Sequence, residues 1–297
     1  MRLADYLTRI HQPSPTARDA DTLQRLHRAH RETFLFENLA IQTGGGVALA
    51  ICDLERKFLD EGRGGYCFEH NSLFAAALRE IDLDSAALLG RVRRGPPHRW
   101  CRTHMVLRVP IDGDVWLADV GFGAMGLLDP IPLREGVTST QGGFTYRLRR
   151  ERELWILSAR DAAAEMDLYE FTEDPQTAWD IEVANHFTST HPESIFRTSL
   201  TVQQTRGSAR TILRSDTITR YREGVMSEAP VAREHLAGVA RAEFGVDLPS
   251  GPFVFERESE KQRAPFPPPL ASKRARATVD APKRLRAKAG RRASRSS

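Results

Sequence analysis

The spacing of apolar residues changes near residue 86, and this change restricts the possible folds more than any other feature of the chain. Before it, the stretch "CFEHNSLFAAALREI" places Cys67, Asn71, Phe74, Leu78 and Ile81 on one face at helical spacing. After it, apolar and polar residues alternate in runs bounded by turn residues, which is typical of strands. Helical segments followed by regularly spaced strands predict an α+β fold with an antiparallel sheet or a small barrel.

Further segments carry helix or strand patterns of their own. "MRLADYLTRIHQ" predicts an amphipathic helix, and "DADTLQRLHRAHRETF" predicts a second helix that Asp19 or Asp21 would cap. "RWCRTHMVLRVPIDGDVWLADVGFG" and "FTYRLRRERELWILSA" each predict two strands around a turn, the second with Glu151-Arg152 near the turn. "NHFTSTHPESIFRTSLTVQQ" is typical of a loop followed by strand, and "SEAPVAREHLAGVARAEFGVDL" predicts a closing helix.

The basic character of the chain resides in its last residues. The 297 residues carry a net charge of +4, but residues 261–297 hold twelve Lys or Arg against one Asp. Residues 1–260 therefore hold 31 basic and 38 acidic side chains, a net charge of −7. Because the basic charge belongs to the tail, it is no sign of a nucleic-acid groove in the folded part, and we expect at most a weak attachment to polyanions through the tail. The Pro-rich, basic composition predicts a disordered tail over residues 256–297.

The cysteines and the apolar content indicate the class of protein. Cys52, Cys67 and Cys101 provide no disulfide framework. The N-terminus lacks the apolar core of a secretory signal, and no stretch approaches the roughly 18 uncharged apolar residues that a membrane helix needs. We therefore expect a cytoplasmic protein with reduced thiols and no membrane partner.

Cys67 stands in the stretch "GRGGYCFEHN", directly after two glycines and a tyrosine. Gly64 and Gly65 permit a tight entry into a helix. A thiol in the first helical turn faces unpaired N–H groups, which favour the thiolate and lower the thiol pKa. Three interpretations are open: a packed thiol, a metal ligand in C-x-x-H spacing with His70, and a nucleophile. Because no second pair of ligands has matching spacing, we expect no metal.

A nucleophilic cysteine needs a base, and the first predicted hairpin offers one. If residues 112–113 form a two-residue turn, the numbers of opposed residues sum to 225. His104 and Asp119 are then diagonal neighbours on one face, so the carboxylate can hold the imidazole. Together with Cys67 they form a candidate Cys-His-Asp triad.

These motifs resemble those of the arylamine N-acetyltransferase family. "RGGYCFEHNSLF" is similar to its nucleophile motif, "RTHMVLRV" to its histidine strand and "WLADVGFG" to its aspartate strand. "FLFENLAI" and "NHFTSTHPESIF" extend the resemblance, which runs from residue 1 to about residue 250. The resemblance implies Cys67 as nucleophile, His104 as base and Asp119 as the residue that orients the base, in a core like that of cysteine proteases. It also implies a helical bundle over residues 1–85, a β-barrel over 86–185 and an α/β lid over 186–255.

The same resemblance implies an acyltransferase of xenobiotic metabolism with acetyl-coenzyme A as cosubstrate. An acetyl group would pass to Cys67 and then to an arylamine or arylhydrazine, with ping-pong kinetics. Gly121, Gly123 and Gly126 of "DVGFGAMG" are expected to let the backbone approach a coenzyme A phosphate. Two alternatives keep the triad: an amide synthase similar to this family, and a transglutaminase-like acyltransferase.

Several neighbours of these motifs are expected to support the site. Arg63 and Glu69 flank the cysteine motif, and we expect a structural pair or network from them. Asn71 follows Cys67 by one helical turn and is expected to hydrogen-bond near the site. The candidates to stack on an aromatic amine, with ordinary core packing as the alternative, are Phe36, Phe68, Phe122 and Phe187.

Overall fold

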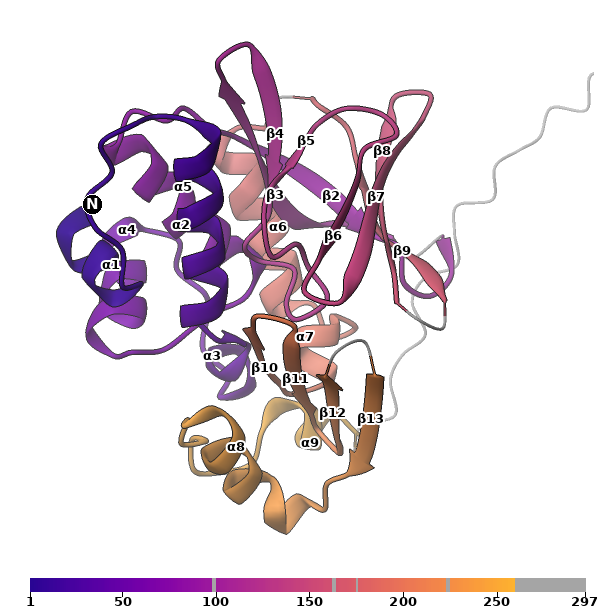
Figure 1. Ribbon diagram of the computed structural model, residues 1–297. Helices are drawn as coiled ribbons and strands as arrows, with labels where there is room; N and C mark the ends of the chain where they lie inside the picture. The colour runs from indigo at the N-terminus through magenta and orange to yellow at the C-terminus, as the bar shows by residue number, and fades with distance from the viewer. Residues whose placement is uncertain (98–99, 162–163, 175, 223–224, 260–297) are drawn as a thin grey trace, which may run out of the picture. The chain divides into compact units, whose positions relative to one another are not determined.

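The computed structural model describes residues 1–259 apart from 98–99, 162–163, 175 and 223–224. Its N-terminal helices lie side by side, coloured indigo to purple in Figure 1. The predicted cap of the second helix is confirmed, because Asp19 accepts a hydrogen bond from the N–H of Thr22. The elements are α1 (Leu3–Arg9), α2 (Ala20–Thr33), α3 (Leu39–Gln42), α4 (Ile51–Glu55) with a π-helical turn (Arg56–Asp60), and α5 (Cys67–Glu80).

An eight-stranded antiparallel sheet follows and curls into a nearly closed, barrel-like form (Figure 1). Its strand order is β5-β4-β3-β2-β9-β8-β7-β6. This confirms the expected combination of helices with an antiparallel, barrel-like sheet. The strands are β2 (Ala86–Val92), β3 (Arg102–Ile111), β4 (Asp114–Ala118), β5 (Ile131–Pro132), β6 (Thr138–Gln141), β7 (Phe144–Glu151), β8 (Leu154–Arg160) and β9 (Glu165–Phe171).

A second sheet joins the start of the chain to its later part. The short strand β1 (Phe36–Glu37) pairs antiparallel with β10 (Thr201–Arg206), in a sheet of order β1-β10-β11-β12-β13. The later strands are β11 (Ala209–Arg214), β12 (Thr217–Arg222) and β13 (Val225–Pro230). The accompanying helices are α6 (Ala178–Thr190), α7 (Ile195–Thr198), a 3-10 turn (Arg233–His235), α8 (Leu236–Phe244) and α9 (Val254–Ser259).

The predicted register of the β3–β4 hairpin is confirmed. Ile111 pairs with Asp114 and Leu107 with Ala118, so each pair of residue numbers sums to 225. The two turn residues, Asp112 and Gly113, have φ values of 51° and 86°. Two consecutive positive φ angles define the turn whose twist matches that of the flanking strands. This register places residue 104 and residue 119 near each other at the open end of the hairpin.

The prediction of a loop for "NHFTSTHPESIF" holds for residues 191–194 and is wrong for the residues on either side. Residues 178–190 form α6, and α7 follows after a short break. Ser and Thr side chains favour loops in isolation, but in α6 they donate to carbonyls one turn earlier, as Thr188 does to Ala184 and Ser189 to Asn185. Thr177 caps the helix, because its hydroxyl accepts from the N–H of Asp180.

The expected domain division stays a prediction, and two of its boundaries fall inside observed helices. The division between residues 185 and 186 falls inside α6, and the start of the tail at residue 256 falls inside α9. The remainder of the predicted disordered tail, from residue 260, lies outside the described residues. The closing helix is confirmed as α8, which ends where Gly245 adopts a φ of 68°. Within the described ranges, no helix is long and apolar enough to cross a membrane.

Strand β3 separates two parts of the hydrophobic core. Met105 and Leu107 belong to the cluster that contains the N-terminal helices, whereas Val106 belongs to the cluster inside the barrel-like sheet. Alternate residues of a strand point to opposite faces, so His104 shares the barrel-facing side with Val106. The strand that carries the predicted base therefore lies against α5 on one face and the barrel interior on the other.

Buried imidazoles connect α2 to α5. His30 Nε2 lies 2.9 Å from His70 Nδ1, and His70 Nε2 lies 3.0 Å from the carbonyl oxygen of Leu35. The carbonyl only accepts, so His70 Nε2 carries hydrogen, His30 Nε2 donates to His70, and Tyr6 donates its hydroxyl hydrogen to His30 Nδ1. Each imidazole must be neutral for this chain of hydrogen bonds to exist.

Burial sets the charge state of these groups. It lowers the pKa of His70 to about 3 and that of His27, also on α2, to about 4, and it lowers the pKa of His30 well below its usual range. An unfolded histidine titrates near about 6.5. The stabilising contribution is therefore complete above about pH 6.5 and is lost as the pH falls toward the folded values.

We predict that the free energy of unfolding, measured by urea denaturation, falls steeply between pH 6.5 and pH 5. Each buried neutral histidine contributes about 1.4 kcal/mol per pH unit, so three give a slope of about 4 kcal/mol per pH unit. His30→Phe should reduce this slope by about one third. A stability that stays level over this range would contradict the assignment of neutral, buried imidazoles.

Candidate active site

Cys67 is the first residue of α5, with its side chain buried against β3. Its exposed fraction is 3%, and its thiol donates to the carbonyl oxygen of Thr103 over 3.6 Å. Thr103 directly precedes His104 in the chain. The thiol therefore sits at the start of a helix, as predicted, and beside the strand that carries the predicted base.

The glycines before Cys67 are required by close packing. A Cβ on Gly64 would lie 1.8 Å from the carbonyl oxygen of Leu35, and a Cβ on Gly65 would lie 2.5 Å from Glu69 Oε2. Neither glycine has a positive φ angle. The glycines therefore permit the tight entry into α5 by leaving room for the Leu35 carbonyl and the Glu69 carboxylate, and not by a left-handed backbone.

His104 and Asp119 form a buried hydrogen-bonded pair, as the hairpin register predicted. His104 Nε2 lies 2.8 Å from Asp119 Oδ2, and the exposed fractions of the two residues are 2% and 0%. The carboxylate accepts, so Nε2 carries the hydrogen and Nδ1 is left as the basic nitrogen. The pair thus presents an imidazole in one defined tautomer, which is what a general base requires.

Asn71 ties the cysteine helix to this pair. Its Nδ2 lies 2.8 Å from the carbonyl oxygen of Met105 and 3.2 Å from both the carbonyl oxygen of Cys67 and Asp119 Oδ1. Its Oδ1 accepts from the N–H of Val120 over 3.2 Å. One buried amide thus joins α5, β3 and the segment after β4, which confirms the expectation that Asn71 hydrogen-bonds near the site.

The charges at the site depend on burial and on these partners. Burial alone would raise the pKa of Asp119, but His104 and the donors Gly121 N–H and Asn71 outweigh it and lower the pKa to about 2. Burial raises the pKa of the Cys67 thiol, and the nearby carboxylate of Asp119 adds to this effect. The backbone N–H of Phe68 at the helix start lowers the thiol pKa, as expected, but burial outweighs it, so the thiol needs a base to lose its proton.

Residues 19–253 match the N-acetyltransferase family model, which covers most of the chain. The chain belongs to the arylamine N-acetyltransferase family. It is 36% identical to the arylamine N-acetyltransferase of Mycolicibacterium smegmatis over 84% of this chain and 93% of that protein. It is also 36% identical to that of Escherichia coli K12, over 66% of this chain and 70% of that protein.

Solved structures of arylamine N-acetyltransferases have the same fold. The M. smegmatis structure gives a TM-score of 0.80 at 34% identity and covers 88% of this chain and 98% of its own. A Mycobacterium marinum arylamine N-acetyltransferase in complex with CoA gives a TM-score of 0.77 at 32% identity. The match covers 82% of this chain and 92% of that protein. The resemblance noted in the cysteine, histidine and aspartate motifs thus extends over the fold.

Arg63 and Glu69 belong to one ion-pair network but do not contact each other as a pair. Arg63 binds Glu37 over 2.7 Å, and Lys57 binds Glu69 over 2.6 Å and lies 3.9 Å from Glu37. Glu69 also accepts from the N–H of Tyr66, directly before the cysteine. The expected network is confirmed. Two further members were not predicted: Glu37, in the family-like stretch "FLFENLAI", and Lys57, which no sequence pattern singles out.

Arg31 shapes the loop after Asp119 and was not predicted. Its guanidinium is buried and donates to the carbonyl oxygens of Gly123 over 2.6 Å and Leu127 over 3.1 Å. Burial lowers the pKa of Arg31 to about 10, so the group stays a cation at neutral pH. On the other side of the loop the buried Arg210 donates to the carbonyls of Ala124 and Gly126.

The three glycines expected to contact coenzyme A are packed against protein groups. A Cβ on Gly121 would lie 2.8 Å from the Cα of Cys67, and one on Gly123 would lie 2.6 Å from Gln203 Oε1. A Cβ on Gly126 would lie 2.8 Å from the Cβ of Phe122. Close packing thus explains each glycine without a ligand, and the contact with a phosphate stays a prediction.

Of the four aromatic candidates, Phe122 lies nearest to the predicted base. Its half-buried ring is 5.0 Å from the imidazole of His104 at an interplanar angle of 78°. Phe68 is fully buried and Phe36 stacks on His70, so both serve the core. Phe187 stacks on His191 at 4.4 Å. Phe122 is thus the candidate that contacts the predicted base, and its stacking on an aromatic amine stays a prediction.

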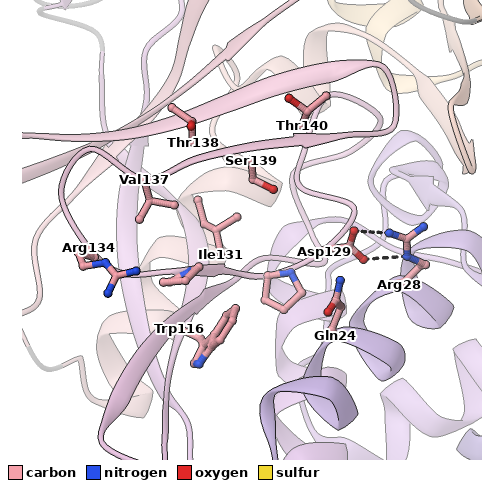
Figure 2. Close-up of a pocket in the computed structure, with 12 residues that line it drawn as sticks. Gln24, Arg28, Trp116, Asp129, Ile131, Arg134, Val137, Thr138, Ser139 and Thr140 are labelled. Carbon is pink, nitrogen blue, oxygen red and sulfur yellow. Dashed lines mark hydrogen bonds and ion pairs between the residues drawn. The ribbon is translucent and has the colours of Figure 1, made fainter.

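An open cavity of about 600 Å³ lies elsewhere, between α2 and the β4–β6 region (Figure 2). Trp116 and Ile131 line it, and Arg28 and Asp129 form an ion pair at one end (Figure 2). Its described lining includes none of the predicted triad residues, so we assign it no part in acetyl transfer. Across the described part of the chain, no cluster of three or more His, Cys, Asp or Glu side chains is arranged to hold a metal ion.

We predict that Gly121→Ala lowers kcat at least about tenfold and also lowers the melting temperature, because the new Cβ would displace the backbone of Cys67. Gly46→Ala is the matched control, since a Cβ there would meet nothing within 4 Å. Steady-state kinetics should show an unchanged KM for acetyl-coenzyme A. A large rise in this KM at unchanged kcat would instead indicate that Gly121 contacts the cosubstrate.

Proposed function

We propose that this chain is an arylamine N-acetyltransferase that carries an acetyl group on Cys67 between its two substrates. The observation that supports this most directly is the buried pair of His104 and Asp119, held beside the start of α5 by Asn71. Membership of the family and likeness to an enzyme solved in complex with CoA support acetyl-coenzyme A as the donor. The acceptor is an arylamine or arylhydrazine.

In the first half-reaction the Cys67 sulfur attacks the thioester carbonyl carbon of acetyl-coenzyme A. The thiol proton passes to His104 Nδ1, because Nε2 already holds the hydrogen that Asp119 accepts. The resulting imidazolium is stabilised by a carboxylate that stays ionised down to about pH 2. The oxyanion forms near the backbone N–H groups at the start of α5. The bond to coenzyme A sulfur then breaks, and the leaving thiolate takes the proton from His104.

In the second half-reaction the amine nitrogen attacks the acetyl carbon on Cys67. An aromatic amine keeps its lone pair at neutral pH, so it attacks without prior deprotonation. The amine proton passes to His104 Nδ1 as the new C–N bond forms and the bond to sulfur breaks. The Cys67 thiolate then recovers a proton from His104, and the enzyme returns to its starting state.

Two alternatives use the same three residues and differ in the donor. An amide synthase similar to this family would take a carrier-bound acyl group, and a transglutaminase-like acyltransferase would take a glutamine side chain. The identity to named arylamine N-acetyltransferases over most of the chain favours coenzyme A as the carrier. The fold division into a bundle, a barrel and a lid, and the cytoplasmic location, remain part of this proposal.

The test is incubation with acetyl-coenzyme A followed by intact-mass measurement and peptide mapping. We expect a gain of one acetyl group on the peptide that contains Cys67, and release of the group when an arylamine is added. Cys67→Ala should show no gain. Asp119→Asn should slow acetylation by about a thousandfold or more, because the amide can hold the wrong imidazole tautomer.

Two outcomes would overturn the proposal. One is an unmodified wild-type enzyme that acylates from a glutamine peptide or a carrier-bound acyl group instead. The other is acetylation of Asp119→Asn at the wild-type rate, which would reduce Asp119 to a structural residue of the hairpin.

A further inference from the structure

His27 holds the main chain of Asp119 through a fully buried imidazole on α2. Its Nδ1 lies 2.9 Å from the carbonyl oxygen of Leu128, and its Nε2 accepts from the N–H of Asp119 over 3.0 Å. The ring packs edge-on against Phe74 of α5, with centroids 5.7 Å apart. The His27 side chain thus connects α2 to Leu128 and to Asp119, the residue predicted to orient His104.

The two partners fix the protonation of His27. A carbonyl oxygen only accepts, so Nδ1 must carry hydrogen, and Nε2 must offer a lone pair to the N–H of Asp119. The charged groups that face the ring are Arg31 on its own helix, Asp119 itself and Asp129 beyond the loop. Burial lowers the pKa of His27 to about 4, so the neutral tautomer persists at neutral pH.

The position of Asp119 in the sheet explains why this hydrogen bond matters. The paired part of the β3–β4 ladder ends at Leu107 and Ala118, one residue before Asp119. The side chain of Asp119 is held by His104, Asn71 and the N–H of Gly121, but its own N–H bonds to His27 instead of a neighbouring strand. The imidazole thus supplies the acceptor for this N–H just beyond the paired part of the strand.

We propose that His27 is a positioning residue for acetyl transfer: it fixes the backbone of Asp119 and thereby the carboxylate that holds His104. This inference rests on the proposed function, since it assigns His27 a role through Asp119. His27 would affect the rate at which Cys67 is acetylated and would not affect the binding of acetyl-coenzyme A.

Two substitutions of similar size separate the two hydrogen bonds. His27→Gln places an amide oxygen near the position of Nε2, so it can still accept from the N–H of Asp119. His27→Asn places its amide near Nδ1, so it can reach Leu128 but is too short for Asp119. His30→Asn is the matched control, because it removes a buried imidazole of the same helix that bonds Tyr6 and His70 instead.

The measurement is the single-turnover rate of Cys67 acetylation, with thermal melts and KM for acetyl-coenzyme A on each variant. We expect His27→Asn to slow acetylation at least about tenfold, and His27→Gln to stay within about threefold of wild type, with KM unchanged in both. His30→Asn should lower the melting temperature and leave the acetylation rate within about threefold.

Equal rates in His27→Asn and His27→Gln, with parallel losses of melting temperature, would overturn the inference and leave His27 a structural residue. If His27→Asn does not fold, His27→Gln decides: a tenfold loss of rate in the folded variant contradicts the role. A wild-type enzyme that never acetylates Cys67 would refute the proposed function instead, so the two failures are distinguishable.

Discussion

The hydrogen bond between His104 Nε2 and Asp119 Oδ2 is the interaction on which the site depends, and it is buried completely. A buried carboxylate is costly unless it is paired and hydrogen-bonded. Asp119 meets this requirement with three donors, and each donor comes from a different part of the chain. Asn71 binds both the carboxylate and the Cys67 carbonyl, so the charge that orients the base also fixes the cysteine helix.

The parts of the site that depend on short-range rules were predictable from the sequence. The turn at residues 112–113 sets the register, because two positive φ angles suit an Asp-Gly pair, and the register brings His104 to Asp119. Helical spacing placed Cys67 at the start of α5 and Asn71 one turn later. The hairpin register depends on one turn type, and the positions of Cys67 and Asn71 depend on one helical turn. Both are therefore decided by residues close together in the sequence.

The parts that depend on tertiary burial were not predictable. The helix α6 contains Ser and Thr residues that favour loops in isolation, yet its apolar face packs against the core and its hydroxyls bond its own carbonyls. Gly64 fits against a carbonyl of Leu35, a contact that no local pattern reveals. Burial also reverses the expected shift of the Cys67 pKa. The desolvation of a group depends on the residues packed around it in space, and the residues next to Cys67 in the sequence do not show how deeply the thiol is buried.

His104 is the group that makes the buried Cys67 thiol reactive in the proposed mechanism. The most direct test is the rate of iodoacetamide alkylation at each cysteine near neutral pH, in wild type and in His104→Gln. We expect wild-type Cys67 to react before the exposed Cys52 and the half-buried Cys101, and to react after them in His104→Gln. Alkylation of Cys67 at the same rate in both proteins, or after Cys52 in the wild type, would contradict this role of His104.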